Sequence, residues 1–407
     1  MSDSAHWWER SDLRYREGRL EFAGQDLAAL AAAGTPAYVY NAGRVRENLT
    51  RLQAALSEVA VDHDIFYALK ANRYAPLIDA LRATKRCGID ACSPAEVRLA
   101  LAHGFAEAQI SFTGHAVSEA DLDILAGHPG VHINCDAIST IRRLGRRGPR
   151  HIGIRLNPGL GAGYNEKLRY AGAKPTKFGV YPDRFEEALA TAASLGLVVD
   201  TLHFHIGSGY QGDALEVLDQ VLEGAMRLID AHPGIRRLNI GGGLGVRMTA
   251  ADVPVDLGRW AAIIARHAGP RGLRIAVEPG DYLVKDAGLL LAQVNTAEEK
   301  AGTRFVGIDA GLGILNLWAY YGIPYVVAPL QIRPGALRER VSISGNINEA
   351  IDLLAEDIEL PALAEGDFIA LVNVGGYGSA AASNHCMRGA YREILLPGAD
   401  GFSRNRS

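Results

Sequence analysis

Eight short β-rich runs follow one another between residues 64 and 280, and each stops at Gly, Pro or a polar residue. They are "DIFYALK" from 64, "CGIDACS" from 87, "QISFTG" from 109, "VHINCD" from 131, "HIGIRLNP" from 151, "LHFHIGS" from 202, "RLNIGGG" from 237 and "LRIAVEPG" from 273. The segments between them are mostly helical in pattern, with Ser93-Pro94 and Pro182-Asp183 as expected helix starts. Eight strand-helix alternations predict an α/β fold, a parallel (β/α)8 barrel of the TIM type.

The pattern changes after about residue 284, where longer strand-like runs such as "LLLAQVNTAEE" and "DFIALVNVGGYG" have few helical patterns between them. These runs predict a C-terminal β-sandwich or β-barrel domain. The N-terminal piece "GRLEFAGQDLAALAAAGTPAYVY" lies outside the eight runs, and we expect it to pair with that domain. The predicted domains are therefore residues 42–283 for the barrel, and residues 1–41 with 284–407 for a discontinuous β domain.

Composition narrows the class of ligand. The chain has 407 residues, is 48% hydrophobic and carries a net charge of -4, so it can bury a large core but offers no electrostatic case for nucleic acid or a membrane surface. Small solutes are the expected ligands. The four cysteines form no CxxC pair and suit neither a metal site nor a disulfide framework, and the first residues lack the features of a signal peptide. We therefore expect a cytoplasmic protein without a metal.

The carboxyl ends of the strands carry the chemistry in barrels of this kind. Here those ends present Lys70, Asp90, His115, Asp136, Asn157, His205, Ser208, Gly241 to Gly243 and Glu278. A lone lysine at a strand end most often extends into water, and a lone glutamate is as often a helix cap or a salt-bridge partner. The convergence of so many polar residues on one face favours a shared site.

Three of these features together match the demands of one cofactor. "NIGGGLG" ends a strand in three glycines, which lets backbone amides approach an anion closely, and the hydroxyls of Ser208 and Tyr377 are candidate donors to the same phosphate. Lys70 is a candidate Schiff-base lysine and Glu278 a candidate partner for a pyridinium nitrogen. His205 is flat enough to stack on a ring. The combination predicts pyridoxal 5'-phosphate.

The motifs, taken in order, resemble a known family. They are "FYALKAN", "DACSPAEV", "FTGHAVSEADL", "RLNPG", "TKFGVY", "HFHIGS", "NIGGGLG", "VEPG", "IDAG", "GNINEAID" and "GGYG". They resemble the alanine-racemase-like, fold type III pyridoxal phosphate decarboxylases, and diaminopimelate decarboxylase most closely. The resemblance implies that Lys70 attaches the cofactor, that Glu278 keeps the pyridine nitrogen protonated, and that Asp90 and Arg155 lie near the ring. It also implies that His205 stacks on the ring and that Ser208, Gly241, Gly242, Gly243 and Tyr377 hold the phosphate.

The same resemblance implies a homodimer in which a loop of the partner's β domain completes each active site. That loop is typically Cys-Glu-Ser-x-Asp, and its cysteine returns a proton to Cα after carbon dioxide leaves. In this chain "GNINEAID" keeps Glu349 and Asp352 but has Asn348 at the cysteine position. Asparagine cannot act as that acid.

Other departures from the family fall on the side that would face the substrate. Asp281 replaces the arginine of the family's Glu-Pro-Gly-Arg motif. The family's Arg-Pro-Ala-Leu-Tyr segment reads Leu-Trp-Ala-Tyr-Tyr at residues 317–321, and only its alanine and its last residue, Tyr321, match. His385-Cys386 replaces a Tyr-Asn pair. The resulting prediction is a catalytic set of Lys70, His205, Asn348 and Glu349. The predicted substrate-binding residues are Asp281, Tyr321, Asn348, Glu349, Asp352 and His385.

Because an arginine fork is the group suited to a distal carboxylate, its loss argues against diaminopimelate as the substrate. We expect a decarboxylase for another amino acid, free or carrier-bound, with a cationic or bulky conjugated tail. The proton would come from a water held by Asn348, from His385 or from Cys386. A racemase, an enzyme that diverts the reaction to another acceptor, and a pyridoxal phosphate-binding protein without activity remain alternatives.

Overall fold

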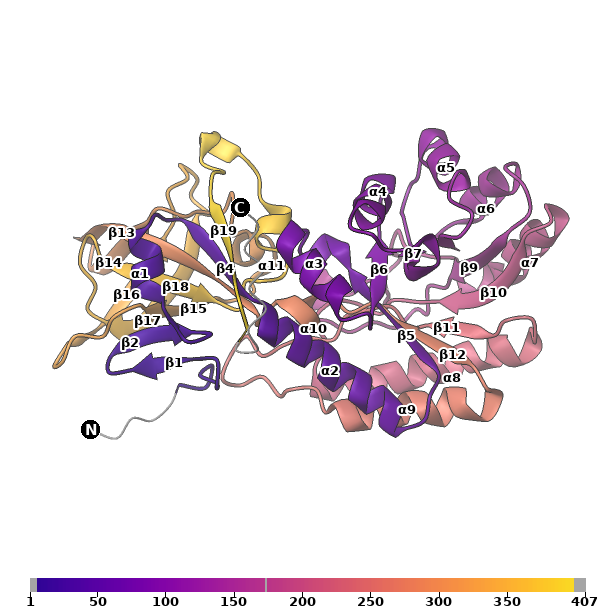
Figure 1. The fold of residues 1–407 in the computed structure, drawn as a ribbon, viewed down its shortest axis with the longest axis horizontal. Coiled ribbons are helices and arrows are strands. Elements are labelled where there is room, and N and C mark those ends of the chain that lie inside the picture. The colour runs from indigo at the N-terminus through magenta and orange to yellow at the C-terminus, as the bar shows by residue number, and fades with distance from the viewer. Residues whose placement is uncertain (1–5, 173, 399–407) are drawn as a thin grey trace. The chain divides into compact units, whose positions relative to one another are not determined.

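The computed structural model describes residues 6–172 and 174–398, which divide into two compact units (Figure 1). One unit comprises Asn48–Val246 and Val253–Tyr282, and the other comprises the remaining described residues. The domain boundaries expected at residues 42 and 283 remain a prediction.

The first unit is a closed barrel of eight parallel strands, which confirms the predicted fold class. The strands are β5 (His63–Ala68), β6 (Gly88–Ala91), β7 (Ile110–Phe112), β8 (His132–Cys135), β9 (His151–Arg155), β10 (Val198–His203), β11 (Arg237–Asn239) and β12 (Arg274–Val277). They pair in chain order, and β12 closes the barrel by pairing with β5. All eight predicted runs are therefore strands, each ending at the edge where the polar residues gather.

Helices alternate with these strands and lie around the outside of the barrel (Figure 1). They are α2 (Ala42–Glu58), α3 (Ala75–Ala83), α4 (Pro94–Ala102), α5 (Glu119–Ala126), α6 (Ile138–Gly145), α7 (Phe185–Ser194), α8 (Leu215–Ala231) and α9 (Leu257–Ala268). The short, buried helix α10 (Asp281–Val284) follows β12. The predicted start at Ser93-Pro94 is confirmed, since the Ser93 side chain accepts a hydrogen bond from the backbone N–H of Glu96 and so caps α4. Pro182 begins a 3₁₀ turn, Pro182–Arg184, which leads directly into α7.

The second unit is a nearly closed, mixed β-barrel. Its strands are β4 (Ala37–Asn41), β13 (Gly288–Lys300), β14 (Thr303–Ile308), β15 (Val326–Pro329), β16 (Arg338–Ser344), β17 (Leu353–Pro361), β18 (Phe368–Val372) and β19 (Arg392–Leu396). The N-terminal strand β4 pairs with β13 and β19, as expected from the sequence. A small sheet of β1 (Leu13–Arg16), β2 (Arg19–Phe22) and β3 (Gln25–Asp26), with the helices α1 (Leu27–Ala32) and α11 (Leu317–Tyr321), completes the unit.

Strand β17 was not among the predicted runs. Its sequence carries charged residues at 356, 357 and 359, and Asp357 has a positive φ of 52° where the pairing with β16 shifts register. β17 is the last strand in the order of its sheet. Because it is charged and irregular, it lacks the apolar run from which the other strands were predicted.

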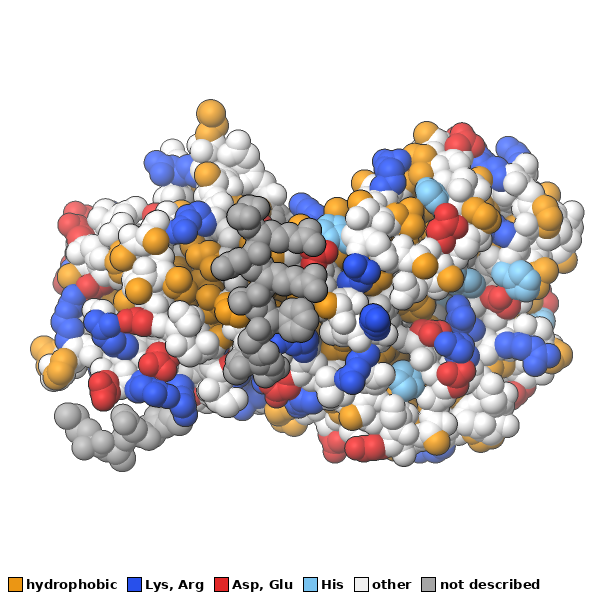
Figure 2. All heavy atoms as spheres, viewed as in Figure 1, with side chains coloured by type: hydrophobic (Ala, Val, Ile, Leu, Met, Phe, Trp, Pro, Cys, Tyr) orange, Lys and Arg blue, Asp and Glu red, His pale blue; other side chains and the backbone are white. Residues whose placement is uncertain are grey.

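The surface gives no sign of a single-sign charged patch on the face drawn in Figure 2, where acidic and basic side chains are interspersed. Within residues 6–172 and 174–398, every helix is too short or too polar to cross a bilayer.

Candidate active site

Lys70 lies two residues past the end of β5, on the 3₁₀ turn Leu69–Ala71. Its Nζ is 3.4 Å from Oδ2 of Asp90, which lies in β6, and 3.4 Å from Sγ of Cys92, which follows that strand. Burial raises the pKa of the Cys92 thiol to about 12, so the sulfur is uncharged beside the amine. The lysine side chain is 40% exposed while Asp90 is buried, so the amine sits at the border between the barrel and solvent.

Asp90 has an unusual environment for a carboxylate. Burial raises its pKa to about 7, and the negative charge of Glu278 adds to the shift, whereas Lys70 opposes it. Its Oδ1 atom is buried and has no hydrogen-bond partner among the described residues. Asp90 therefore changes protonation near neutral pH, directly beside the amine of Lys70.

Glu278 follows β12 and is buried inside the barrel. It accepts hydrogen bonds from Ser111 Oγ (3.2 Å) and Asn239 Nδ2 (2.7 Å), and its Oε2 lies 3.1 Å from Nε2 of His203. Burial alone would raise the pKa of this carboxyl, but His203, the amide of Asn239 and the charge of Lys70 together lower it. The side chain is thus held as a carboxylate in the barrel interior.

The three glycines after β11 form a stretch of backbone that leaves no room for side chains. A Cβ atom at Gly242 would lie 2.0 Å from the carbonyl oxygen of Glu278, and one at Gly243 would lie 2.1 Å from that of Gly207. Gly243 also has a φ of +105°, which side chains rarely allow. Ser208 is half-buried on the neighbouring loop, where its backbone N–H donates to Leu168 O. Such bare backbone next to a hydroxyl suits a phosphate group.

His205 lies two residues beyond His203, on the loop that follows β10. Its pKa is lowered well below the ordinary value, first by burial and then by the charges of Lys70 and Arg155, so the ring is neutral. The ring centroid lies 4.9 Å from that of Tyr170. A neutral, aromatic face at this edge of the barrel is suited to packing against a planar ligand.

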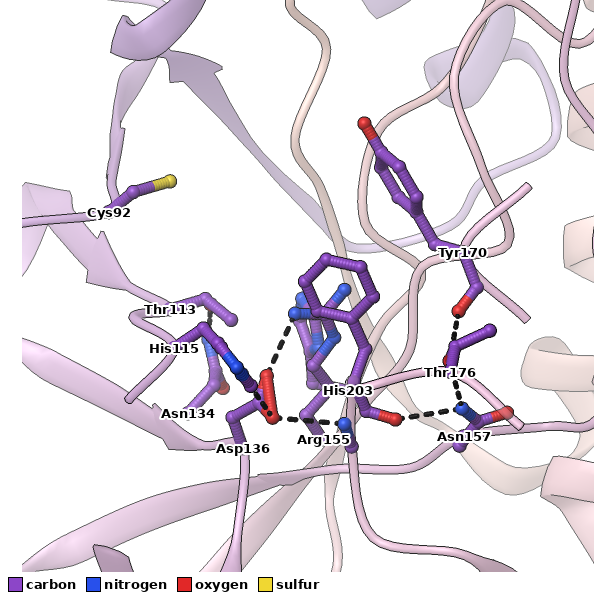
Figure 3. Close-up of polar contacts among 12 residues, drawn as sticks. Cys92, Thr113, His115, Asn134, Asp136, Arg155, Asn157, Tyr170, Thr176 and His203 are labelled. Atoms are coloured by element: carbon purple, nitrogen blue, oxygen red, sulfur yellow. Dashed lines mark hydrogen bonds and ion pairs between the residues drawn. The ribbon is translucent and has the colours of Figure 1, made fainter. Parts of the chain in front are cut away.

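Arg155, at the end of β9, forms an ion pair with Asp136 (Figure 3). Asp136 accepts from Arg155 Nη1 over 3.1 Å and from the backbone N–H of Gly179 over 3.0 Å. The guanidinium carbon of Arg155 lies 4.5 Å from the centroid of the Phe178 ring. Asn157 donates to the carbonyl oxygen of Phe178 over 2.7 Å, so the loop after β9 is fastened to the barrel mouth on both sides of Phe178.

The remaining predicted residues lie in two places. Asp281 is buried in the barrel unit at the first position of α10, and Tyr321, Asn348, Glu349, Asp352, Tyr377 and His385 lie in the β unit. Glu349 and His385 are brought together, with Oε1 of the former 3.0 Å from Nε2 of the latter, and both are about half-exposed. Asn348 is exposed beside Glu349.

Asp352 and Tyr377 have neighbours that explain their positions. The buried carboxylate of Asp352 accepts from the backbone N–H groups of Leu312 (2.6 Å) and Ile347 (2.7 Å), so it fastens two loops of the β unit. Its assignment as a substrate contact stays a prediction. The Tyr377 ring has the buried Lys285 Nζ at 5.8 Å from its centroid.

Three residues of this region were missed in the sequence. His203, Ser111 and Asn239 surround Glu278, whereas Asp136, which holds Arg155, was expected at its strand end. His203 precedes His205 by two positions, so alternation along the strand could have revealed it. Ser111 is a lone hydroxyl inside an apolar run, which is too common a pattern to single it out.

The barrel residues fit pyridoxal phosphate. Buried polar atoms without a hydrogen-bond partner in the described part of the chain include Asp90 Oδ1, His203 Nδ1 and His205 Nδ1, and all three residues belong to the group around Lys70 and Glu278. An amine, a buried carboxylate, a flat imidazole and a glycine cradle are the parts that this cofactor requires. By contrast, the described residues contain no cluster of three His, Cys, Asp or Glu side chains that could hold a metal ion.

Comparisons with known proteins agree with this fit. Residues 42–285 match the family described as "Pyridoxal-dependent decarboxylase, pyridoxal binding domain". The diaminopimelate decarboxylase of Methanothermobacter thermautotrophicus is 34% identical over 394 residues, which cover 93% of this chain and 91% of the relative.

Solved structures give the same result. Diaminopimelate decarboxylase from M. jannaschii in co-complex with L-lysine is 26% identical, with a TM-score of 0.86 and coverage of 95% of this chain and 93% of that chain. The Helicobacter pylori enzyme complexed with L-lysine is 26% identical, with a TM-score of 0.83 and coverage of 91% and 94%. The chain therefore belongs to the pyridoxal-dependent decarboxylases, and its (β/α)8 barrel is the pyridoxal-binding domain of that family.

Proposed function

We propose that this decarboxylase acts on an α-amino acid other than diaminopimelate, in a biosynthetic pathway. One observation carries the proposal: the residues that fit the cofactor are kept, while Asp281 stands where the family motif has arginine. The Asp281 carboxylate is buried at the start of α10. A carboxylate there repels a distal carboxylate on the substrate, whereas it favours a cationic tail.

The barrel residues have complementary roles in this proposal. Bound pyridoxal phosphate supplies an electron sink for the charge left at Cα when the carboxylate departs. Lys70 would attach the cofactor, Asp90 and Arg155 would lie near its ring, and Glu278 would accept a hydrogen bond from the protonated ring nitrogen. His205 would stack on the ring, and Ser208, the three glycines and Tyr377 would hold the phosphate.

We infer that His385 returns the proton to Cα in place of the family's cysteine. Imidazole can carry a proton at neutral pH, and the contact with Glu349 orients the ring. Cys386 is adjacent and exposed, and Asn348 has no acidic proton to give. As in the family, the proposal places these residues in a homodimer, where each β unit would complete its partner's site.

The test is proton NMR in deuterated water of the cofactor-loaded protein with a panel of D- and L-amino acids that includes diaminopimelate, lysine, ornithine and arginine. We expect one of them to lose its carboxylate and give an amine with a single deuterium at Cα. The Lys70→Ala variant serves as the control and should give no product.

A second function is favoured by Asn348, which removes the usual acid. It is the conversion of the amino acid without loss of carbon dioxide, by racemisation or transfer to another acceptor. Exchange of the Cα hydrogen with the carboxylate retained would support it and contradict the decarboxylase. A protein that never gains the absorbance of covalently attached cofactor would contradict both.

A further inference from the structure

Glu278 is surrounded by hydrogen-bond donors from three other barrel strands. Ser111 on β7 and Asn239 on β11 both contact Oε1, while His203, the last residue of β10, contacts Oε2. All four side chains are buried, with at most 6% of their surface exposed. The arrangement is therefore fixed by the barrel and not by solvent.

The direction of each bond follows from its neighbours. The backbone N–H of Gly241 donates to Asn239 Oδ1 over 2.9 Å, and because a backbone N–H can only donate, the Nδ2 of Asn239 must face Glu278. Ser111 Oγ receives a hydrogen bond from Asn134 Nδ2 over 3.1 Å, which directs the Ser111 proton to Glu278. Oε1 of Glu278 therefore faces two donors. Burial raises the pKa of Glu278, but its polar partners lower it further, so the side chain is a carboxylate and Nε2 of His203 donates to Oε2.

His203 uses one ring nitrogen for this contact. Its Nε2 lies 3.1 Å from Oε2 of Glu278, whereas its Nδ1 is buried and has no partner among residues 6–172 and 174–398. The imidazole thus supplies one directed N–H to the carboxylate.

We propose that His203 is a positioning residue, whose Nε2–H holds Glu278 ionised and oriented so that Oε2 accepts the ring N–H of the bound cofactor. Across the described residues, Oε1 receives two donors and Oε2 receives one, which leaves acceptor capacity on Oε2. The inference rests on the proposed contact between Glu278 and the ring nitrogen. Without the imidazole, the buried carboxylate takes up a proton, and Oε2 can no longer accept a hydrogen bond from the ring N–H.

The test compares the affinity of the full-length, cofactor-free protein for pyridoxal phosphate and for its 1-deaza analogue, in which a C–H replaces the ring nitrogen. We expect the wild type to prefer pyridoxal phosphate by about tenfold or more, the scale of a hydrogen bond to a charged group. His203→Leu should lower this preference to within about threefold of unity. His203→Gln keeps an N–H near the same place and should restore it. Circular dichroism verifies that each variant is folded.

A folded His203→Leu protein that keeps the wild-type preference would overturn the inference. If that variant does not fold, His203→Asn replaces it, because the shorter asparagine side chain cannot reach Glu278. The same ratio of affinities for pyridoxal phosphate and its 1-deaza analogue is then measured. The Glu278→Gln variant tests the proposed contact with the ring nitrogen separately from the role of His203. Retention of the preference in Glu278→Gln would refute the proposed contact with the ring nitrogen, whereas retention in His203→Leu or His203→Asn alone would refute only the role of His203.

Discussion

Asp90 makes a testable contribution at the scale of a single residue. Burial raises its pKa from 3.8 to about 7, so the native protein keeps a proton that the unfolded chain has released. This contribution to the free energy of unfolding is complete below pH 4 and is lost as pH rises through 7. In the cofactor-free protein, the stability of Asp90→Asn relative to wild type should therefore increase from pH 5 to 7 and level off above.

The measurement is urea unfolding of both proteins across that range. The exposed Asp183→Asn variant is the matched control, and its difference from wild type should stay flat. A flat difference for Asp90→Asn as well would mean that Asp90 titrates at its ordinary pKa in the folded protein.

His385 carries the second prediction at this scale. If it returns the proton to Cα, His385→Ala should lower kcat by roughly a hundredfold or more, the usual contribution of a general acid. Glu349→Gln should have a smaller effect, because it only loosens the ring. Cys386→Ala, in the neighbouring position of the same turn, should retain its rate. The comparison is made by carbon dioxide release, and a His385→Ala enzyme with an unchanged rate would exclude the imidazole as the donor.

At the scale of elements, Asp136 joins β8, β9 and the loop that leads to α7 (Figure 3). Asp136→Asn replaces one acceptor by a donor, so either Arg155 or Gly179 loses its partner. Breaking a buried pair in this way costs roughly 3 kcal/mol or more. We expect a lower free energy of unfolding and faster tryptic cleavage after Arg169 and Lys177. Asp183→Asn, with the same chemical change at an exposed site, should do neither. Equal stability and cleavage in the two variants would show that Asp136 does not hold the loop.

Some strands could be predicted from the sequence, and others could not. The eight barrel strands could be predicted because each ends at a glycine, a proline or a polar residue, and helical patterns separate them. Strand β17 could not, since its charges and its register shift hide the periodicity. The donors around Glu278 come from β7, β10 and β11, and nothing in one sequence indicates which side chains of separate strands meet across a barrel.

At the scale of the whole molecule, the chain combines the pyridoxal-binding barrel of the family with a β unit in which we expect the substrate motifs to differ. Figure 1 shows both units and the N-terminal strand β4 that belongs to the second. The barrel residues fit pyridoxal phosphate by their contacts. Asn348 and His385 in the β unit, like Asp281 at the end of the barrel unit, mark the departures from the family. We propose that the cofactor chemistry is retained and that the substrate has changed.

The most direct measurement is kcat/KM of the cofactor-loaded protein for diaminopimelate and for the amino acid of the panel that is decarboxylated fastest. Without an arginine for the distal carboxylate, diaminopimelate should be poorer by about tenfold or more, the scale of a charged hydrogen bond. If diaminopimelate instead has the highest kcat/KM of the panel, the altered motifs have not changed the substrate, and the proposed change of substrate is contradicted.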